Sequence, residues 1–259
     1  MAQSFNIEGQ RIWVVGASEG IGFEVVKQLL QQKACVVASA RKAESHSELT
    51  KLKSDFPERL HLLNCDVTLT DSLPDKSDQA WSFFDGLDHW IYNVGSYHPM
   101  HLKEWDLSQF DFMTQTNYLG AVHLMHALLP YFKTSPNSQW LWNVSLASDF
   151  GLPYGGGYSA PKAALMNLAE SLQPELAAIG IQLKVVNHGF VKTRLTAKND
   201  FAMLGLMEAD EAAQKIVTAL GRNSFETRFP FNLGLVLATL KRLPKSWSLA
   251  ITKRMLKNA

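Results

Sequence analysis

The sequence predicts a single α/β domain: a three-layer, doubly wound parallel sheet of the Rossmann type with helices on both faces. Short apolar runs alternate with helical patterns along almost the whole chain, which is typical of a parallel sheet. A glycine-rich turn at residues 16–22 joins the first apolar run to the first helical pattern. With 259 residues, the chain is long enough to bury one large core without disulfides or metals.

The expected elements follow one another in regular order. Strands are predicted at residues 12–15, 34–38, 60–65, 89–93, 140–145 and 182–187, and helices at 21–31, 107–132 and 158–178, with a charged helix after the second strand. Pro161 is expected in a first helical turn, where no intrahelical bond is lost. The three glycines at 155–157 are expected to form a loop. We expect the domain to cover residues 1–228, with residues 229–259 as an extension of it or a contact segment.

The turn after the first strand has the composition of a phosphate loop. Glycines allow the backbone to turn tightly and to approach a pyrophosphate, and the helix that follows directs free amides at the anion. We therefore expect Gly16, Ser18, Gly20 and Ile21 to bind a dinucleotide. The alternative is a glycine-rich turn that binds nothing.

The residues after the second strand indicate which dinucleotide binds. Asp or Glu at that point suits the ribose 2′-hydroxyl of NAD, whereas Arg suits the 2′-phosphate of NADP. The chain has Arg41 and Lys42 there and no carboxylate, which favours NADP(H) over NAD(H). Glu19, inside the glycine loop, slightly offsets this positive field. Arg41 could instead be a solvated surface charge.

Tyr158 and Lys162 stand four residues apart in a predicted helix, so their side chains project from one face. A cation about 4 Å from a phenol can lower its pKa by up to roughly three units, into the range of a general acid or base. Ser145, upstream of the pair, could donate a hydrogen bond to a substrate oxygen. Taken alone, a Tyr and a Lys at this spacing occur in many helices.

In combination, these residues resemble the short-chain dehydrogenase/reductase family, over about residues 6–228. The family's remaining motifs have counterparts in the same order: Asp66-Val67, then Tyr92-Asn93-Val94-Gly95, Asn117, Ser145, the Tyr158–Lys162 pair, and His188-Gly189 followed by Val191 and Thr193. Val15, Tyr92 and His188 stand where the family usually has Thr, Asn and Pro. We expect the bracing hydrogen bonds of the first two to be absent or replaced, and the His188 turn to be looser.

The resemblance implies a role for each matched residue in the cofactor site. Asp66 and Val67 would contact adenine, and Val191 and Thr193 would lie at the nicotinamide amide. Asn93 and Gly95 would complete the cofactor site.

The resemblance also implies hydride transfer between NADP(H) and a carbonyl or alcohol. Tyr158 would donate the proton as general acid and Ser145 would bond the carbonyl oxygen. Lys162 would lower the pKa of Tyr158 and contact the nicotinamide ribose, and Asn117 would hold a water that links Lys162 to solvent. The alternative is a non-catalytic NADP(H)-binding sensor or scaffold on the same fold.

The expected substrate is a small carbonyl or alcohol compound, apolar in character. Ligands sit beyond the carboxyl ends of the strands, so the walls should come from residues 96–102, 146–157 and the segment after Thr193. The candidate lining residues are His98, Phe150, Tyr154, Phe190 and Met203. Residues 193–210 are expected to form a lid. Tyr97, Trp105, Trp142 and the pairs His98/His101 and His123/His126 are interpreted as packing or surface residues, and no metal site is expected.

The overall charge of +1 gives no reason to expect a nucleic acid partner. Cys35 and Cys65 fall in predicted strands and are expected to be buried thiols. The chain starts without the pattern of a signal peptide, so a cytoplasmic location is expected. The resemblance implies a homodimer or homotetramer through the helices of Asn117 and Tyr158.

The C-terminal segment has a distinct charge pattern. After Glu226 there is no acidic residue, and seven basic residues follow. Residues 229–240 are strongly apolar but too few to span a bilayer. The segment is interpreted as a core or subunit-contact helix with a solvated basic end. Peripheral attachment to anionic lipid is the alternative.

Overall fold

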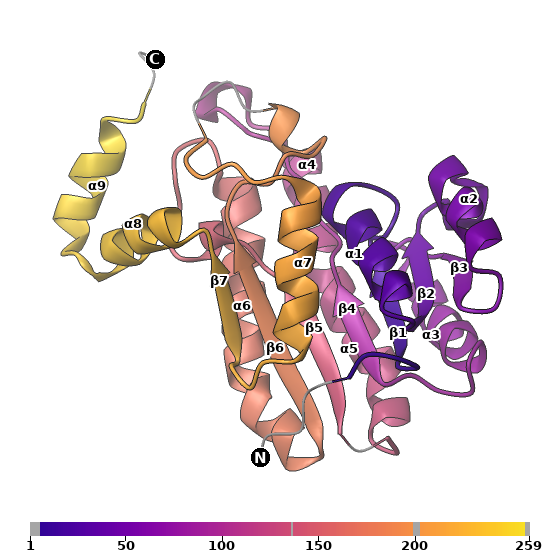
Figure 1. Cartoon of the computed structure of the whole chain (residues 1–259). Helices are drawn as coiled ribbons and strands as arrows, with labels where there is room; N and C mark the ends of the chain where they lie inside the picture. The colour runs from indigo at the N-terminus through magenta and orange to yellow at the C-terminus, as the bar shows by residue number, and fades with distance from the viewer. Residues whose placement is uncertain (1–5, 136, 199–202, 257–259) are drawn as a thin grey trace.

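The computed structural model describes residues 6–135, 137–198 and 203–256, which form one α/β domain (Figure 1). Seven parallel strands form one sheet in the order β3-β2-β1-β4-β5-β6-β7. The strands are β1 (Arg11–Val15), β2 (Cys35–Ala40), β3 (Leu60–Asn64), β4 (His89–Tyr92), β5 (Ser138–Asn143), β6 (Ile181–His188) and β7 (Glu226–Phe229). This confirms the predicted fold class.

The helices cover both faces of the sheet and its β7 edge (Figure 1). They are α1 (Gly20–Gln31), α2 (Ser47–Asp55), α3 (Leu73–Ser82), α4 (Leu107–Thr114), α5 (Gly120–Phe132), α6 (Gly156–Ala178), α7 (Ala209–Leu220), α8 (Phe231–Arg242) and α9 (Lys245–Lys253). Short 3₁₀ turns lie at Ala43–Ser45, Thr70–Ser72, Leu102–Glu104, Leu146–Ser148 and Thr196–Lys198. Within the described residues, no helix is both long and apolar enough to cross a membrane.

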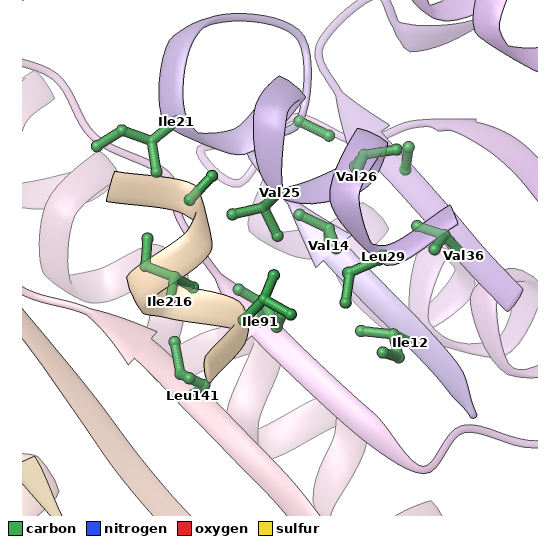
Figure 2. Packing of buried hydrophobic residues seen from close by; sticks show 14 of the residues in the cluster. Ile12, Val14, Ile21, Val25, Val26, Leu29, Val36, Ile91, Leu141 and Ile216 are labelled. Atoms are coloured by element: carbon green, nitrogen blue, oxygen red, sulfur yellow. The ribbon is translucent and has the colours of Figure 1, made fainter. Parts of the chain in front are cut away.

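The buried side chains form two large clusters, one on each face of the sheet. On one face, α1 and α7 pack against the central strands, and Figure 2 shows Val25, Leu29 and Ile216 directed at Val14 and Ile91. On the other face, α3, α5 and α6 cover a cluster rich in tryptophan. Strands buried on both faces explain why the apolar runs of the sequence are nearly continuous.

Four expectations about the elements are corrected. The helix predicted at residues 107–132 is interrupted by a π-helical turn, Gln115–Leu119, between α4 and α5. Gly156 and Gly157 belong to the first turn of α6 rather than to a loop. Pro161 is therefore the sixth residue of α6 and removes one intrahelical hydrogen bond. Finally, β7 continues the sheet beyond β6.

The two cysteines differ in burial. Cys65 is buried just after β3, and burial raises the pKa of its thiol to about 12. Cys35, the first residue of β2, is half-buried, and burial raises its pKa as well. Both are free thiols, and their raised pKa values make them unreactive at neutral pH.

Candidate active site

A cleft of about 850 Å³ opens at the carboxyl ends of the strands. The strand order reverses between β1 and β4, which is the position where open α/β sheets bind ligands. Every residue predicted to bind the cofactor lines this one cleft: Gly16, Ser18, Gly20, Ile21, Arg41, Asp66, Val67, Asn93, Gly95, Tyr158, Lys162, Val191 and Thr193. Ser145 lines it as well.

The glycine loop is shaped so that side chains are excluded from it. Gly16 has φ +91°, and a Cβ there would lie 2.9 Å from the Asn93 backbone. A Cβ on Gly22 would overlap the carbonyl oxygen of Gly16. Glu19 precedes α1 without capping it, so the first amides of the helix remain directed at the cleft. This geometry suits a pyrophosphate.

A chain of hydrogen bonds connects the glycine loop to Lys162. The Asn93 Nδ2 donates to the carbonyl oxygen of Gly16 at 2.9 Å, and the Asn143 Nδ2 donates to the Asn93 Oδ1 at 2.6 Å. The Lys162 Nζ then donates to the backbone oxygen of Asn143 at 2.8 Å. Asn143, the last residue of β5, therefore holds both the loop and the lysine. Asn143 was not among the site residues predicted from the sequence.

Tyr92 replaces the family asparagine with a different brace. Its phenol donates to the carbonyl oxygen of Thr116 at 2.6 Å, inside the π-helical turn. Gly120 lies so close that a Cβ there would be 2.7 Å from the same phenol oxygen. The hydrogen bond that the family asparagine would make is thus replaced by the bond from the Tyr92 phenol to Thr116. Through this bond, Tyr92 supports the turn that carries Asn117.

Asn117 is the one predicted catalytic residue that does not line the cleft. Its side chain is fully buried behind the loop after β4. The Asn117 Oδ1 accepts from the Ser96 N–H at 2.7 Å, and its Nδ2 donates to the Ser96 carbonyl at 2.9 Å. The amide therefore positions the loop of Ser96. A water held by Asn117 stays a prediction.

Ser145, Tyr158 and Lys162 meet at the centre of the cleft. Ser145 follows β5 and is hydrogen-bonded to the Tyr158 phenol in the first turn of α6. The ring of Tyr97 packs edge-on against Tyr158, with 5.3 Å between centroids. The Lys162 Nζ lies 6.0 Å from the centroid of the Tyr158 ring.

The pKa values at this centre differ from the sequence-based expectation. Burial raises the pKa of Tyr158, the hydrogen bond with Ser145 acts in the opposite direction, and the neighbouring Tyr97 adds to the rise. Burial lowers the pKa of Lys162 to about 7. Lys162 was expected to lower the pKa of Tyr158, but its own burial disfavours the charge that this effect requires. Tyr158 is therefore a phenol that retains its proton at neutral pH.

His188 is held more firmly than its replacement of proline suggested. Its Nδ1 lies 2.7 Å from the Gly189 carbonyl and donates to it, and its ring stacks on Phe229 at 6.2 Å. Burial lowers the pKa of His188 to about 4. The hydrogen bond with Gly189 acts in the opposite direction, and nearby Lys162 lowers the pKa further. The imidazole is therefore neutral, and side-chain contacts replace the stiffness of a proline ring.

The segment after β6 crosses the cleft toward the glycine loop. Arg194 forms an ion pair with Glu19, 2.9 Å from Nε to Oε2, between two exposed side chains. At the other end of the segment, the Lys198 Nζ donates to the Tyr97 carbonyl at 2.8 Å. Residues 199–202 of the predicted lid lie outside the described residues. The Glu19–Arg194 pair was not predicted, because nothing in the sequence places two such distant residues together.

The substrate end of the cleft is mostly apolar or aromatic. Of the predicted lining residues, Tyr154 and Phe190 are on its wall, whereas His98, Phe150 and Met203 are not among the described residues that line it. Phe150 instead packs beneath the wall. Leu146 and Leu152 lie on the predicted wall segment 146–157, and Tyr97, interpreted as a packing residue, lies on segment 96–102. Leu233 and Leu237 of α8 also line the cleft and were not predicted.

The aromatic residues interpreted as packing residues differ in burial. Trp142 is fully buried, as expected of a packing residue, but Trp105 is half exposed and Tyr97 belongs to the cleft. Across the described ranges, no group of three potential metal ligands is found.

The sequence model of the protein family described as short chain dehydrogenase matches residues 10–203. The chain belongs to the short-chain dehydrogenase/reductase family. It is thus an oxidoreductase of that family. A Staphylococcus epidermidis protein named an uncharacterised oxidoreductase is 29% identical over 212 residues, which cover 82% of this chain and 90% of the relative. A Myxococcus xanthus protein of the same description is 28% identical over 93% of this chain and 96% of its own length.

Solved structures share the fold. A short chain dehydrogenase from Burkholderia cenocepacia in complex with NADP has a TM-score of 0.82 and 23% identity, and the match covers 98% of this chain and all of that one. This likeness concerns the fold, and the site residues of the present chain rest on its own geometry.

Proposed function

We propose that this protein is an NADP(H)-dependent oxidoreductase that transfers hydride between the nicotinamide and a carbonyl or alcohol, with Tyr158 as general acid or base. One observation carries the proposal. Ser145, Tyr158 and Lys162 lie in the same cleft as the other eleven residues expected to bind the dinucleotide. A protein that only bound the dinucleotide would have no chemical need for that set beside the site.

The residues of the cleft fit a dinucleotide. The glycines at positions 16 and 22 let the loop pack against the Asn93 backbone and against itself, and the start of α1 presents free amides to the cleft. These residues would hold the pyrophosphate, with Asp66 and Val67 at the adenine and Val191 and Thr193 at the nicotinamide. When bound, the cofactor supplies the hydride.

The chain's own residues handle the proton and the substrate oxygen. Tyr158 has a raised pKa and is protonated at neutral pH, as a proton donor in the reducing direction must be. The hydroxyl of Ser145, which neighbours Tyr158, would donate to the substrate oxygen and stabilise negative charge on it. Lys162 holds a proton in equilibrium near pH 7, and the phosphates of a bound dinucleotide would favour its charged form.

Preference for NADP(H) rests on Arg41. It follows β2 directly, is exposed, and lines the cleft where a 2′-phosphate would lie. The Burkholderia structure of the same fold holds NADP. Arg194 also pairs with Glu19, which offsets the acidic charge in the glycine loop. Arg41→Asp should lower kcat/KM for NADPH relative to NADH by about tenfold or more, since it replaces attraction by repulsion. An unchanged ratio would remove Arg41 as the selector.

Tyr158→Phe tests the catalytic assignment. The variant should lose turnover by about a hundredfold or more, with NADPH affinity within about twofold of the natural chain, because only the proton donor is removed. Tyr97→Phe, a neighbouring Tyr on the same wall, is the matched control and should stay active. Retained turnover in Tyr158→Phe contradicts the assignment. NADPH binding without turnover of any carbonyl in a broad panel would favour the non-catalytic sensor or scaffold.

A further inference from the structure

Helix α9 has the reverse of the usual surface-helix pattern. Its buried residues are polar: Ser248 is 0% exposed, and its hydroxyl donates to the Leu240 carbonyl at 2.7 Å. Trp247 and Ile251, one turn apart, are 63% and 44% exposed. A helix that only packed on the domain would bury its apolar side chains and expose its polar ones. The outward side of α9 is therefore built to meet something apolar.

The exposed apolar side chains of α9 are part of a larger surface. Figure 1 shows α8 and α9 standing beyond the β7 edge of the sheet. We define the C-terminal apolar surface as the large exposed apolar residues of this region: Leu204, Leu206, Phe231, Leu235, Val236, Trp247, Leu249, Ile251, Met255 and Leu256. Gly205 joins the first two to α8, since a Cβ there would lie 2.6 Å from Pro230. Concentrated apolar exposure of this kind marks an interaction site.

The charge around this surface selects its partner. From residue 229 to 256 there is no Asp or Glu, and the exposed basic residues are Lys241, Arg242, Lys245, Lys253 and Arg254. The whole chain has a net charge of only +1, so positive charge is concentrated here. A symmetric contact between two copies through α9 would bring these cations against one another. Anionic lipid headgroups complement them, and the apolar side chains fit the boundary of the acyl chains.

We propose that α8 and α9 attach the protein to the surface of membranes that contain anionic lipid, with Trp247 and Ile251 inserted at the headgroup boundary. The inner side of α8 connects the membrane-facing surface to the active site, because Leu233 and Leu237 line the substrate end of the cleft. An apolar substrate dissolved in the bilayer would reach the cleft beside the attached face. That route depends on the proposed oxidoreductase function, whereas attachment does not.

The test is flotation of the full chain with vesicles of phosphatidylcholine alone or mixed equally with phosphatidylglycerol. We expect flotation with the mixed vesicles, and at least a fivefold smaller bound fraction with phosphatidylcholine or at high salt, because Coulomb attraction is screened. The tryptophan fluorescence of the chain should shift to the blue on binding and be quenched by brominated acyl chains, and both changes should be lost in the variant without Trp247. Soluble glycerophosphoglycerol should not release the protein, which distinguishes the bilayer from a free phosphate.

Two pairs of variants give matched controls. Trp247→Ser with Ile251→Ser should lower the bound fraction about tenfold, while Leu69→Ser with Ile179→Ser, at sites 61% and 41% exposed elsewhere, should not. Lys253→Gln with Arg254→Gln should weaken binding severalfold, and Lys51→Gln with Lys133→Gln should not. NADPH turnover off the membrane should be unchanged in all four.

Three outcomes would overturn the attachment. One is a full chain that fails to float with the mixed vesicles. Another is binding that is indifferent to Trp247→Ser with Ile251→Ser. The third is a concentration-dependent dimer in the absence of lipid that the same variant dissociates, which would identify a second copy of the chain as the partner.

Discussion

Replacing Lys162 by methionine should increase the stability of the folded protein at pH 7 and also abolish its activity. Lys162 is 3% exposed, and its pKa falls from an ordinary 10.5 to about 7. Each pKa unit corresponds to about 1.36 kcal/mol of proton-binding free energy. At pH 7, the lowered pKa of Lys162 therefore destabilises the folded state by about 4 kcal/mol. Methionine removes that penalty but leaves the Asn143 carbonyl without its donor, which costs about 1–3 kcal/mol. Lys162→Met should therefore gain about 1–3 kcal/mol at pH 7.

The pH dependence gives the sharper test of this reasoning. The pKa of Lys162 is lower in the folded chain, so above about pH 7 the unfolded chain binds a proton that the folded chain does not. The stability of the natural protein then rises with pH by up to about 1.36 kcal/mol per pH unit relative to Lys162→Met. The methionine variant's advantage should be largest below about pH 7. It should reverse between about pH 8 and about pH 10, where the shrinking penalty falls below the cost of the unpaired Asn143 carbonyl.

Urea unfolding followed by circular dichroism, without cofactor and at several values between about pH 6 and pH 9, measures this difference directly. Lys51→Met, at an exposed lysine, is the control and should show a constant difference from the natural chain across the same range. Lower stability of Lys162→Met at pH 7, or a difference that does not change with pH, would refute the burial argument.

Two further predictions concern contacts that the sequence did not reveal. Tyr92→Phe should lose about 1–3 kcal/mol of unfolding free energy in urea, because the buried Thr116 carbonyl loses its donor; Tyr131→Phe, which removes an exposed phenol bond, should lose less than about 1 kcal/mol, and equal losses would contradict this. Glu19→Gln should tighten NADPH binding about three- to tenfold in a fluorescence titration at low salt, because it removes an anion and releases Arg194. Identical affinities at low salt would exclude that effect.

The sheet and its cleft were predictable because their signals are local. Buried parallel strands read as continuous apolar runs, and the glycine loop lies between its strand and its helix in sequence. Strand β7 escaped notice because it has only four residues, and Glu226 and Arg228 interrupt its apolar pattern. An edge strand of this length carries no signal that distinguishes it from a loop.

The parts of the site that sequence could not supply depend on contacts between distant segments. The π-helical turn at Asn117 accompanies the approach of Gly120 to Tyr92, which no helical periodicity encodes. The pKa of Lys162 depends on how deeply the folded chain buries it. Spacing placed Lys162 and Tyr158 on one face correctly, but the sign of the shift at Tyr158 required the surrounding packing.

The double role of Asn143 restricts how the cofactor preference of this protein can be altered. Its side chain steadies Asn93 and thereby the glycine loop, while its carbonyl fixes Lys162. The loop and the proton-transfer group thus share one rigid frame, and both are preorganised before any ligand enters. A substitution at Asn93 that is intended to change dinucleotide affinity will also displace the lysine and slow the chemical step. Redesign should work at Arg41, which lies outside that frame.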